Sequence, residues 1–108
     1  MANISTHVLD TVTGRPAAGM AVSLERLEDG SAVEHLASTS TDTDGRVADL
    51  LGGTRLKTGV YRLTFNTAAY GNTFYPEVQI VFRVSDPEEH HHIPLLLSAY
   101  GYSTYRGS

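Results

Sequence analysis

The chain has 108 residues, the size of one domain over residues 1–108, and it lacks cysteine, which excludes disulfides and thiolate metal sites. Its net charge of −4 and singly scattered basic residues argue against a nucleic-acid partner. No apolar run is long enough for a membrane helix and no signal peptide is recognisable, so we expect a cytoplasmic protein.

The predicted elements are short strands joined by turns rich in glycine and aspartate. Alternating apolar and polar residues predict strands over residues 4–9, 21–27, 33–41, 46–50, 59–66, 78–84, 90–98 and 102–105. Residues 67–72 allow one short helical turn. Seven or eight short strands at this spacing, with Asp-Gly turns between them, predict an all-β sandwich.

The end of the chain carries an unusual concentration of functional groups. Residues 100–108 are rich in tyrosine and hydroxyl groups, and the apolar run 93–97 before them should anchor this tail in a core. Arg106 and Ser108 would then supply a cation, a hydroxyl and a carboxylate to a site. Alternatively, the tail is a strand cap that pairs with an acidic neighbour, or its tyrosines pack at an interface between chains.

The histidines allow more than one interpretation. In a strand His7 shares a face with Ser5 and Leu9, where it is either a structural side chain or a general base. His90 and His92 share a face, which makes them half of a strand-borne zinc site that would need a third ligand such as His7. They are otherwise a solvated polar start to a strand.

Several segments occur together in a characteristic order and spacing. They are Ser5-Thr-His-Val-Leu-Asp10, Thr13-Gly-Arg-Pro-Ala17, Thr43-Asp-Gly-Arg46, His92-Ile-Pro-Leu-Leu-Leu-Ser98 and Tyr105-Arg-Gly-Ser108. With them the chain resembles the 5-hydroxyisourate hydrolases of the transthyretin-like family over essentially its whole length. The terminal Tyr-Arg-Gly-Ser discriminates, because the hormone-carrying transthyretins lack it. The resemblance implies a transthyretin-like β-sandwich with one short helix, assembled into a homotetramer with active sites at subunit interfaces.

The same resemblance implies roles for individual residues. His92 matches a catalytic histidine of a metal-free, cofactor-free enzyme, and Arg46, otherwise an ordinary exposed arginine after a turn, matches the active-site arginine. His90 matches a second family histidine whose role is less clear. His91 stands where the family commonly has an aromatic residue, and since it should point away from His92 we expect it to affect packing.

The mechanism expected from the resemblance is attack of water on a ring carbonyl of 5-hydroxyisourate. The product is 2-oxo-4-hydroxy-4-carboxy-5-ureidoimidazoline. His7 and His92 would act as base and acid, and Arg46 would bind the substrate, stabilise charge and lower the pKa of a nearby imidazole. Ser108, supported by Tyr105 and Arg106, would orient water or substrate.

Two other functions remain open on the sequence. One is a non-enzymatic transthyretin-type tetramer that binds a small molecule, since a fold does not fix a function. It would have no need for two imidazoles and a guanidinium in one place. The other is a zinc hydrolase, which requires stoichiometric metal and loses activity on chelation.

Overall fold

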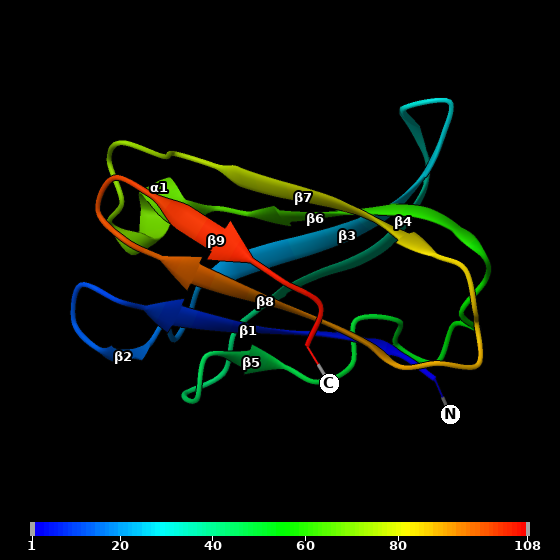
Figure 1. Ribbon diagram of the computed structural model, residues 1–108, viewed down its shortest axis with the longest axis horizontal. Coiled ribbons are helices and arrows are strands. Elements are labelled where there is room, and N and C mark those ends of the chain that lie inside the picture. The colour runs from blue at the N-terminus through cyan, green and yellow to red at the C-terminus, as the bar shows by residue number, and fades with distance from the viewer. Residues whose placement is uncertain (1, 108) are drawn as a thin grey trace.

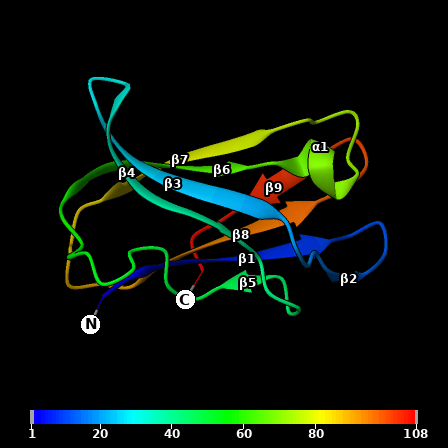
Figure 2. The ribbon, with the colours of Figure 1, turned by 180° about the vertical axis from the view of Figure 1, so that it is seen from behind.

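A computed structural model describes residues 2–107, and these residues form two packed layers of strands (Figures 1 and 2). In chain order the elements are β1 (Ile4–Asp10), β2 (Arg15–Pro16), β3 (Ala21–Glu28), β4 (Ser31–Ser40), β5 (Arg46–Val47), β6 (Gly59–Phe65), α1 (Thr67–Tyr70), β7 (Val78–Val84), β8 (His91–Leu97) and β9 (Tyr102–Thr104). No helix within residues 2–107 has the length and hydrophobicity to cross a membrane.

The strand order places β1 and β8 side by side in the middle of one sheet. That sheet runs β2-β1-β8-β9, with β5 also paired to β1, and the other sheet runs β4-β3-β6-β7. β1 and β8 are parallel, and their register places Ser5 opposite His92 and His7 opposite Pro94. The sheet with β8 and β9 is nearer the viewer in Figure 1, and the sheet with β3 and β4 is nearer in Figure 2.

The core lies between the two sheets, where alternating side chains of each strand meet. Tyr61, Leu63 and Phe65 of β6 are buried, as their alternation predicts, and so are Val78 and Val84 of β7. Burying one such large apolar side chain contributes about 1.5–3 kcal/mol. This alternation leaves the other face of each strand free for polar residues.

The predicted all-β sandwich with a short helix is confirmed, and its differences from the prediction lie in the shortest elements. The eight expected strands are present, but β5 has only two residues. β2 was not predicted because two residues, one of them Pro16, carry no periodic pattern. The expected helical turn is α1, whose N-terminus is capped by Asn66, the acceptor of a hydrogen bond from the Ala69 amide.

The outward face of the β1–β8 pair is the one that carries chemistry. Ile4, Thr6 and Val8 of β1 point into the core and are buried. Ser5 and His7 therefore lie on the outer face, as the alternation predicts, and the parallel register adds His92 to them. The C-terminal tail leads from β9 past β8 toward β5 on this side of the molecule (Figures 1 and 2).

Candidate active site

The turn before β5 is pressed against β1 and fixes the position of Arg46. The carbonyl oxygen of Gly45 accepts a 2.8 Å hydrogen bond from the Val8 amide. Gly45 has φ +74°, and a Cβ there would lie 2.5 Å from the Val8 carbonyl oxygen, so the position requires glycine. The Asp42 carboxylate accepts a 2.9 Å hydrogen bond from the Arg46 amide, which completes the turn.

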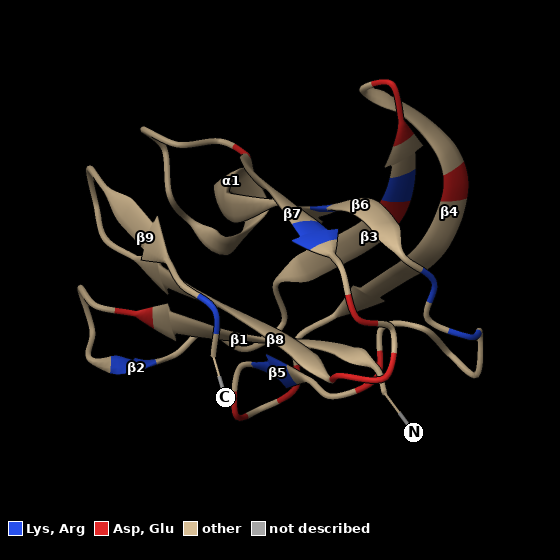
Figure 3. Cartoon of the chain, turned by 45° about the vertical axis from the view of Figure 1, so that its right-hand side comes forward, with Lys and Arg blue, Asp and Glu red and all other residues tan. Residues whose placement is uncertain are grey.

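Arg46 and His7 are direct partners across β5 and β1. Figure 3 shows β5 as a basic element flanked by acidic loop segments. Among residues 2–107 the Arg46 guanidinium makes no ion pair. An exposed guanidinium without a carboxylate partner is available for planar, two-point recognition of an anionic or carbonyl-rich ligand.

A surface cavity of about 280 Å3 lies beside Arg46 and brings the arginine together with two of the histidines. It is lined by Ser5, Thr6, Arg46, Val47, Ala48, His90 and His92. His7 is not among the lining residues, although it is half-buried on the same face and adjacent to Arg46 in register. The cavity therefore combines a fixed positive charge with imidazole groups.

Ser5 links the two histidines that line the cavity. Its hydroxyl lies 2.7 Å from Nδ1 of His92 and 2.8 Å from Nε2 of His90. Since Nδ1 of His92 is engaged, Nε2 is the ring nitrogen left for a ligand or a water molecule. An imidazole whose one nitrogen is held by a hydrogen bond has a fixed ring orientation, which general acid–base chemistry requires.

The electrostatic surroundings of His92 favour its neutral form. Burial lowers the pKa of His92, and the neighbouring His7, His90 and Arg46 lower it further. The direction agrees with the expectation for an imidazole near Arg46, although burial is the larger cause. A neutral imidazole at neutral pH can accept a proton from water.

The C-terminal tail is held against His92. Gly107 forms an antiparallel bridge with His92, in which the Gly107 amide donates a 2.8 Å hydrogen bond to the His92 carbonyl oxygen. A Cβ on Gly107 would lie only 2.6 Å from Cδ2 of His92, so the backbone of the tail lies directly on the imidazole ring. Arg106 forms a 2.6 Å ion pair with Glu89.

The model of the HIUase/Transthyretin family matches residues 4–107, nearly all of the chain. The chain belongs to this family. A 5-hydroxyisourate hydrolase of Mesorhizobium japonicum is 48% identical to it, and the match covers 97% of this chain and 91% of that relative.

Two solved structures, one named as a hydrolase and one as a transthyretin, are similar to this chain. A Klebsiella pneumoniae 5-hydroxyisourate hydrolase has a TM-score of 0.86 at 38% identity, with 100% of both chains covered. Sea bream transthyretin, solved in complex with thyroxine, also has a TM-score of 0.86, at 30% identity, covering 98% of this chain and 95% of that one. The fold is therefore shared by a relative named as an enzyme and by one named as a binder.

The structure brings some of the predicted site residues together and separates others. Arg46 and His92 line one cavity, and His7 is adjacent. Arg106 contacts Glu89, as the alternative of an acidic neighbour expects, and Tyr105 is exposed outside the cavity lining. Ser108 lies outside the described residues.

Ser5 lines the cavity and contacts both of its histidines, but the sequence prediction left it without a role and left the role of His90 open. The signal for Ser5 was its position two residues before His7 on the same face. Its contact with His92 depends on the parallel register of β1 and β8, which no local pattern reveals. His91 is 4% exposed and is not among the residues that line the cavity, and its Nδ1 lies 2.8 Å from the Glu89 carbonyl oxygen, in keeping with the expected packing role.

The residues described between 2 and 107 contain no group of three histidine, cysteine, aspartate or glutamate side chains arranged to hold a metal ion. His90 and His92 each direct a ring nitrogen toward the Ser5 hydroxyl, at 2.8 and 2.7 Å. The pair that suggested zinc in the sequence is thus engaged with a hydroxyl.

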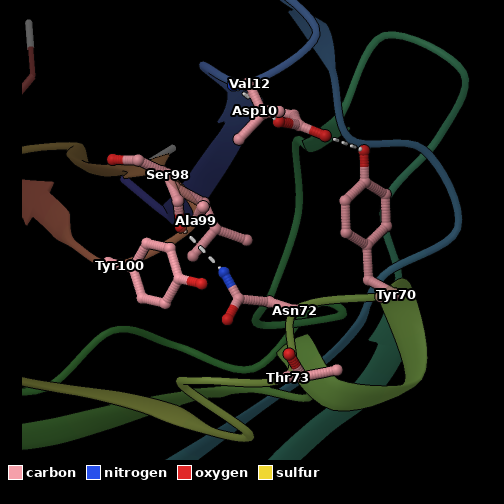
Figure 4. Close-up of a pocket in the computed structure, with 10 residues that line it drawn as sticks. Asp10, Val12, Tyr70, Asn72, Thr73, Ser98, Ala99 and Tyr100 are labelled. Atoms are coloured by element: carbon pink, nitrogen blue, oxygen red, sulfur yellow. Dashed lines mark hydrogen bonds between the residues drawn. The ribbon is translucent and has the colours of Figure 1, made fainter.

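Another cavity, of about 330 Å3, lies where β1 and β8 end, and hydrogen bonds within the chain cross it (Figure 4). There the Tyr70 hydroxyl donates a 2.8 Å hydrogen bond to Asp10, and the Asn72 amide donates one of 2.8 Å to the Ser98 carbonyl oxygen. Burial raises the pKa of Asp10, but the hydrogen bonds from Tyr70, Thr13 and Val12 together lower it. These polar groups are occupied by partners within the chain.

Proposed function

We propose that this protein hydrolyses 5-hydroxyisourate, opening the six-membered ring to give 2-oxo-4-hydroxy-4-carboxy-5-ureidoimidazoline. The observation that carries the proposal is the cavity in which the Arg46 guanidinium meets the imidazole of His92. The names of the Mesorhizobium and Klebsiella relatives, at 48% and 38% identity over almost the whole chain, support the same reaction.

The reaction adds water to a ring carbonyl and breaks the adjacent C–N bond. It needs a base for the water proton, a donor for the developing oxyanion and an acid for the leaving ring nitrogen. Proton transfer by a positioned side chain contributes typically about 10²–10⁴-fold, and one electrostatic donor roughly 10²–10³-fold. A substrate that also decays without enzyme needs no covalent nucleophile.

In this proposal His92 and His7 are the proton-transferring groups. The Nε2 atom of His92 faces no hydrogen-bond partner within residues 2–107, whereas its Nδ1 is held by Ser5. The lowered pKa of His92 keeps it neutral and able to accept a proton. His7, partnered with Arg46 across the strands, is on the same face to serve the other half of the reaction.

Arg46 would bind the substrate and stabilise the oxyanion. Its backbone is fixed by Asp42 and by the turn at Gly45, so the side chain starts from an ordered position. A guanidinium offers several N–H donors in a planar fork, which suits the carbonyl groups of an acidic purine derivative. Loss of one oxyanion donor costs roughly 10²–10³ in kcat.

The tail would close the site over His92. The bridge between Gly107 and His92 holds the end of the described chain against His92. In the proposal Ser108 orients water or substrate, and Tyr105 and Arg106 support it. The Arg106–Glu89 ion pair fixes the tail from its exposed side, which makes Arg106 a support for Ser108 as well as a candidate for binding substrate.

The proposed assembly is a homotetramer with active sites at subunit interfaces. β9 and β7 are the last strands of their sheets, and no strand within residues 2–107 pairs with their outer edges. Both edges are on one side, because Tyr75 before β7 packs on Tyr102 of β9 with ring centroids 5.1 Å apart. Unpaired edges beside exposed tyrosines favour pairing with a second copy.

The deciding experiment is an ultraviolet time course of 5-hydroxyisourate generated in place by oxidation of urate. Addition of the protein, with and without a chelator, should accelerate the decay of the substrate to the same extent. Variant Arg46→Ala should lose about 10²–10³-fold, and His35→Ala, which changes an exposed residue of β4, should not.

Other outcomes of this assay would reject the proposal in distinguishable ways. No acceleration by a folded protein would leave a binding protein of the transthyretin type, and a search for its ligand would follow. Acceleration that the chelator abolishes would instead assign His90 and His92 to a metal site.

A further inference from the structure

The Ser5 hydroxyl lies between two imidazole rings, at 2.7 Å from Nδ1 of His92 and 2.8 Å from Nε2 of His90. The Ser5 residue is only 8% exposed, and both recorded partners of its hydroxyl are ring nitrogens. His92 lines the cavity, whereas His90 both lines it and is exposed to solvent. The three side chains thus connect the cavity to the surface.

Counting protons restricts this network to two arrangements when both imidazoles are neutral. A serine hydroxyl has one hydrogen and can also accept, so it donates to one ring and accepts from the other. If both rings donated, the buried hydroxyl hydrogen would lack a partner, which is costly. His90 and His92 therefore share one tautomeric form: both carry the proton on Nδ1, or both carry it on Nε2.

We propose that Ser5 and His90 form a proton relay between His92 and solvent. The relay rests on the proposed function, because it supplies the proton that the hydrolysis removes and returns. Ser5 and His90 are positioning residues in this scheme, since they act on the substrate through His92.

In the first half of the reaction His92 starts with its proton on Nδ1. The attacking water gives a proton to Nε2 of His92 as its oxygen bonds to the ring carbonyl carbon. The Nδ1 proton of His92 passes to Ser5, the original Ser5 proton passes to Nε2 of His90, and Nδ1 of His90 releases a proton to solvent. No net charge remains on the network, and both rings have changed tautomer.

In the second half the same path runs in reverse. As the C–N bond breaks, Nε2 of His92 gives its proton to the leaving ring nitrogen. A solvent proton enters at Nδ1 of His90, the Nε2 proton of His90 moves to Ser5, and the Ser5 proton returns to Nδ1 of His92. In the relay His92 therefore serves first as base and then as acid, and it takes over the proton transfer that the proposed function gave to His7.

The charges around His92 make such a relay useful. Burial, together with His7, His90 and Arg46, lowers the pKa of His92 and so disfavours a persistent imidazolium there. His90 is exposed, and next to it the Glu89 carboxylate pairs with Arg106. Transfer through Ser5 removes the proton without leaving a positive charge beside Arg46.

The matched pair Ser5→Thr and Ser5→Val tests the hydroxyl. The two replacements have nearly the same shape, suit a β-strand equally and differ only in the hydroxyl group. We expect Ser5→Val to turn over roughly ten- to a hundredfold more slowly than Ser5→Thr, within the range of proton-transfer effects. Equal kcat values for the two folded variants would overturn the relay.

His90→Ala tests the solvent end, with His35→Ala, at an exposed site on β4, as its control. We expect His90→Ala to lose about tenfold or more in kcat, and added imidazole to restore much of it, because a small base can reach the exposed position. Imidazole should not accelerate Ser5→Val. A His90→Ala enzyme with full activity, or a slow one that imidazole does not restore, would overturn the relay.

Nitrogen NMR of the free protein separates this inference from the proposed function, because it needs no substrate. Long-range 1H–15N correlations report the tautomer of each ring, and His90 and His92 should have the same one. Opposite tautomers would overturn the network even in an active enzyme. If the wild-type protein fails to hydrolyse the substrate while the tautomers match, the proposed function falls and the hydrogen-bond arrangement stands.

Discussion

At the scale of single residues, the Nε2 atom of His92 is the group on which turnover should depend most. His92→Asn keeps a hydrogen-bonding group near the Ser5 hydroxyl and removes only the far side of the ring. We expect kcat to fall by about 10²–10⁴-fold, with the free energy of unfolding changed by about 1 kcal/mol or less.

The turnover of His92→Asn should be compared with that of His35→Asn, which alters an exposed residue on β4. Thermal unfolding of both variants checks that they are folded. Wild-type turnover in a folded His92→Asn protein would remove His92 from the mechanism.

The ionisation of His92 is a second residue-scale property that can be measured directly. Its pKa should lie below the ordinary value of 6.5, because burial, His7, His90 and Arg46 all disfavour the imidazolium. Arg46→Gln removes one positive charge, so the pKa of His92 should rise. NMR titration of the His92 ring proton checks this, with Arg83→Gln on β7 as the charge-matched control.

The lowered pKa of His92 also determines how its contribution to stability changes with pH. When the pKa of a histidine is lower in the folded protein, the unfolded chain binds the proton first. The contribution of His92 to the free energy of unfolding is therefore complete above pH 6.5 and decreases as the pH falls through that value. Turnover that depends on neutral His92 should persist to a pH below 6.5, and an unshifted or raised pKa would contradict the assignment.

Gly107 connects the residue scale to the element scale, because its lack of a side chain lets the tail lie on His92. Gly107→Ala places a Cβ 2.6 Å from Cδ2 of His92, so the ring or the tail must move. We expect about a tenfold or larger loss of kcat, since proton transfer requires fixed geometry. The melting temperature should change little, because the tail contributes little core.

Gly101→Ala is the matched control for this change. Gly101 is in the turn before β9, and a Cβ there would meet only Ser98 Oγ, at 3.9 Å. Equal turnover in both alanine variants would mean that the contact between the tail and the His92 ring has no role in catalysis.

At the scale of elements, the tail after β9 should be separable from the fold. β9 pairs with β8 through residues up to Thr104, and the bridge at Gly107 and the Arg106–Glu89 ion pair come after it. Removal of residues 106–108 should abolish turnover and leave a soluble oligomer, which sedimentation and the urate-coupled assay measure together.

Glu89→Gln provides the comparison for this truncation. It breaks the exposed ion pair with Arg106, which is worth about 1 kcal/mol or less, and keeps the chain intact. Partial activity is expected from Glu89→Gln. An aggregated truncation would show instead that the tail is needed for folding.

The elements also show which features were readable from the sequence. The faces of β6 and β7 and the outward position of His7 follow from strict alternation, which is local. The pairing of β1 with β8, and with it the contact of Ser5 with His92, joins residues 87 positions apart and has no local signature. The ion pair of Arg106 with Glu89 has no local signature either. The sequence therefore left two roles open for Arg106, binding the substrate or pairing with an acidic neighbour.

At the scale of the whole molecule, only the family resemblance predicts an assembly. Strand alternation identifies a sandwich, but it does not say which strands end the sheets. The strand orders identify those ends as β2 and β9 in one sheet and β4 and β7 in the other. The predicted homotetramer can therefore be tested at particular edge strands.

Two exposed valines on opposite edge strands of one sheet provide the test. Val81 of β7 is 58% exposed and Val33 of β4 is 50% exposed, so a lysine at either position disturbs little within one chain. If β7 pairs with β7 of a second copy, Val81→Lys brings like charges together across the interface and weakens it. We expect Val81→Lys to sediment as smaller species at low concentration, while Val33→Lys keeps four times the 11.7 kDa of one chain.

A tetramer that resists Val81→Lys but dissociates with Val33→Lys would assign the interface to β4. In that case contact between subunits would not explain the exposed tyrosines beside β9.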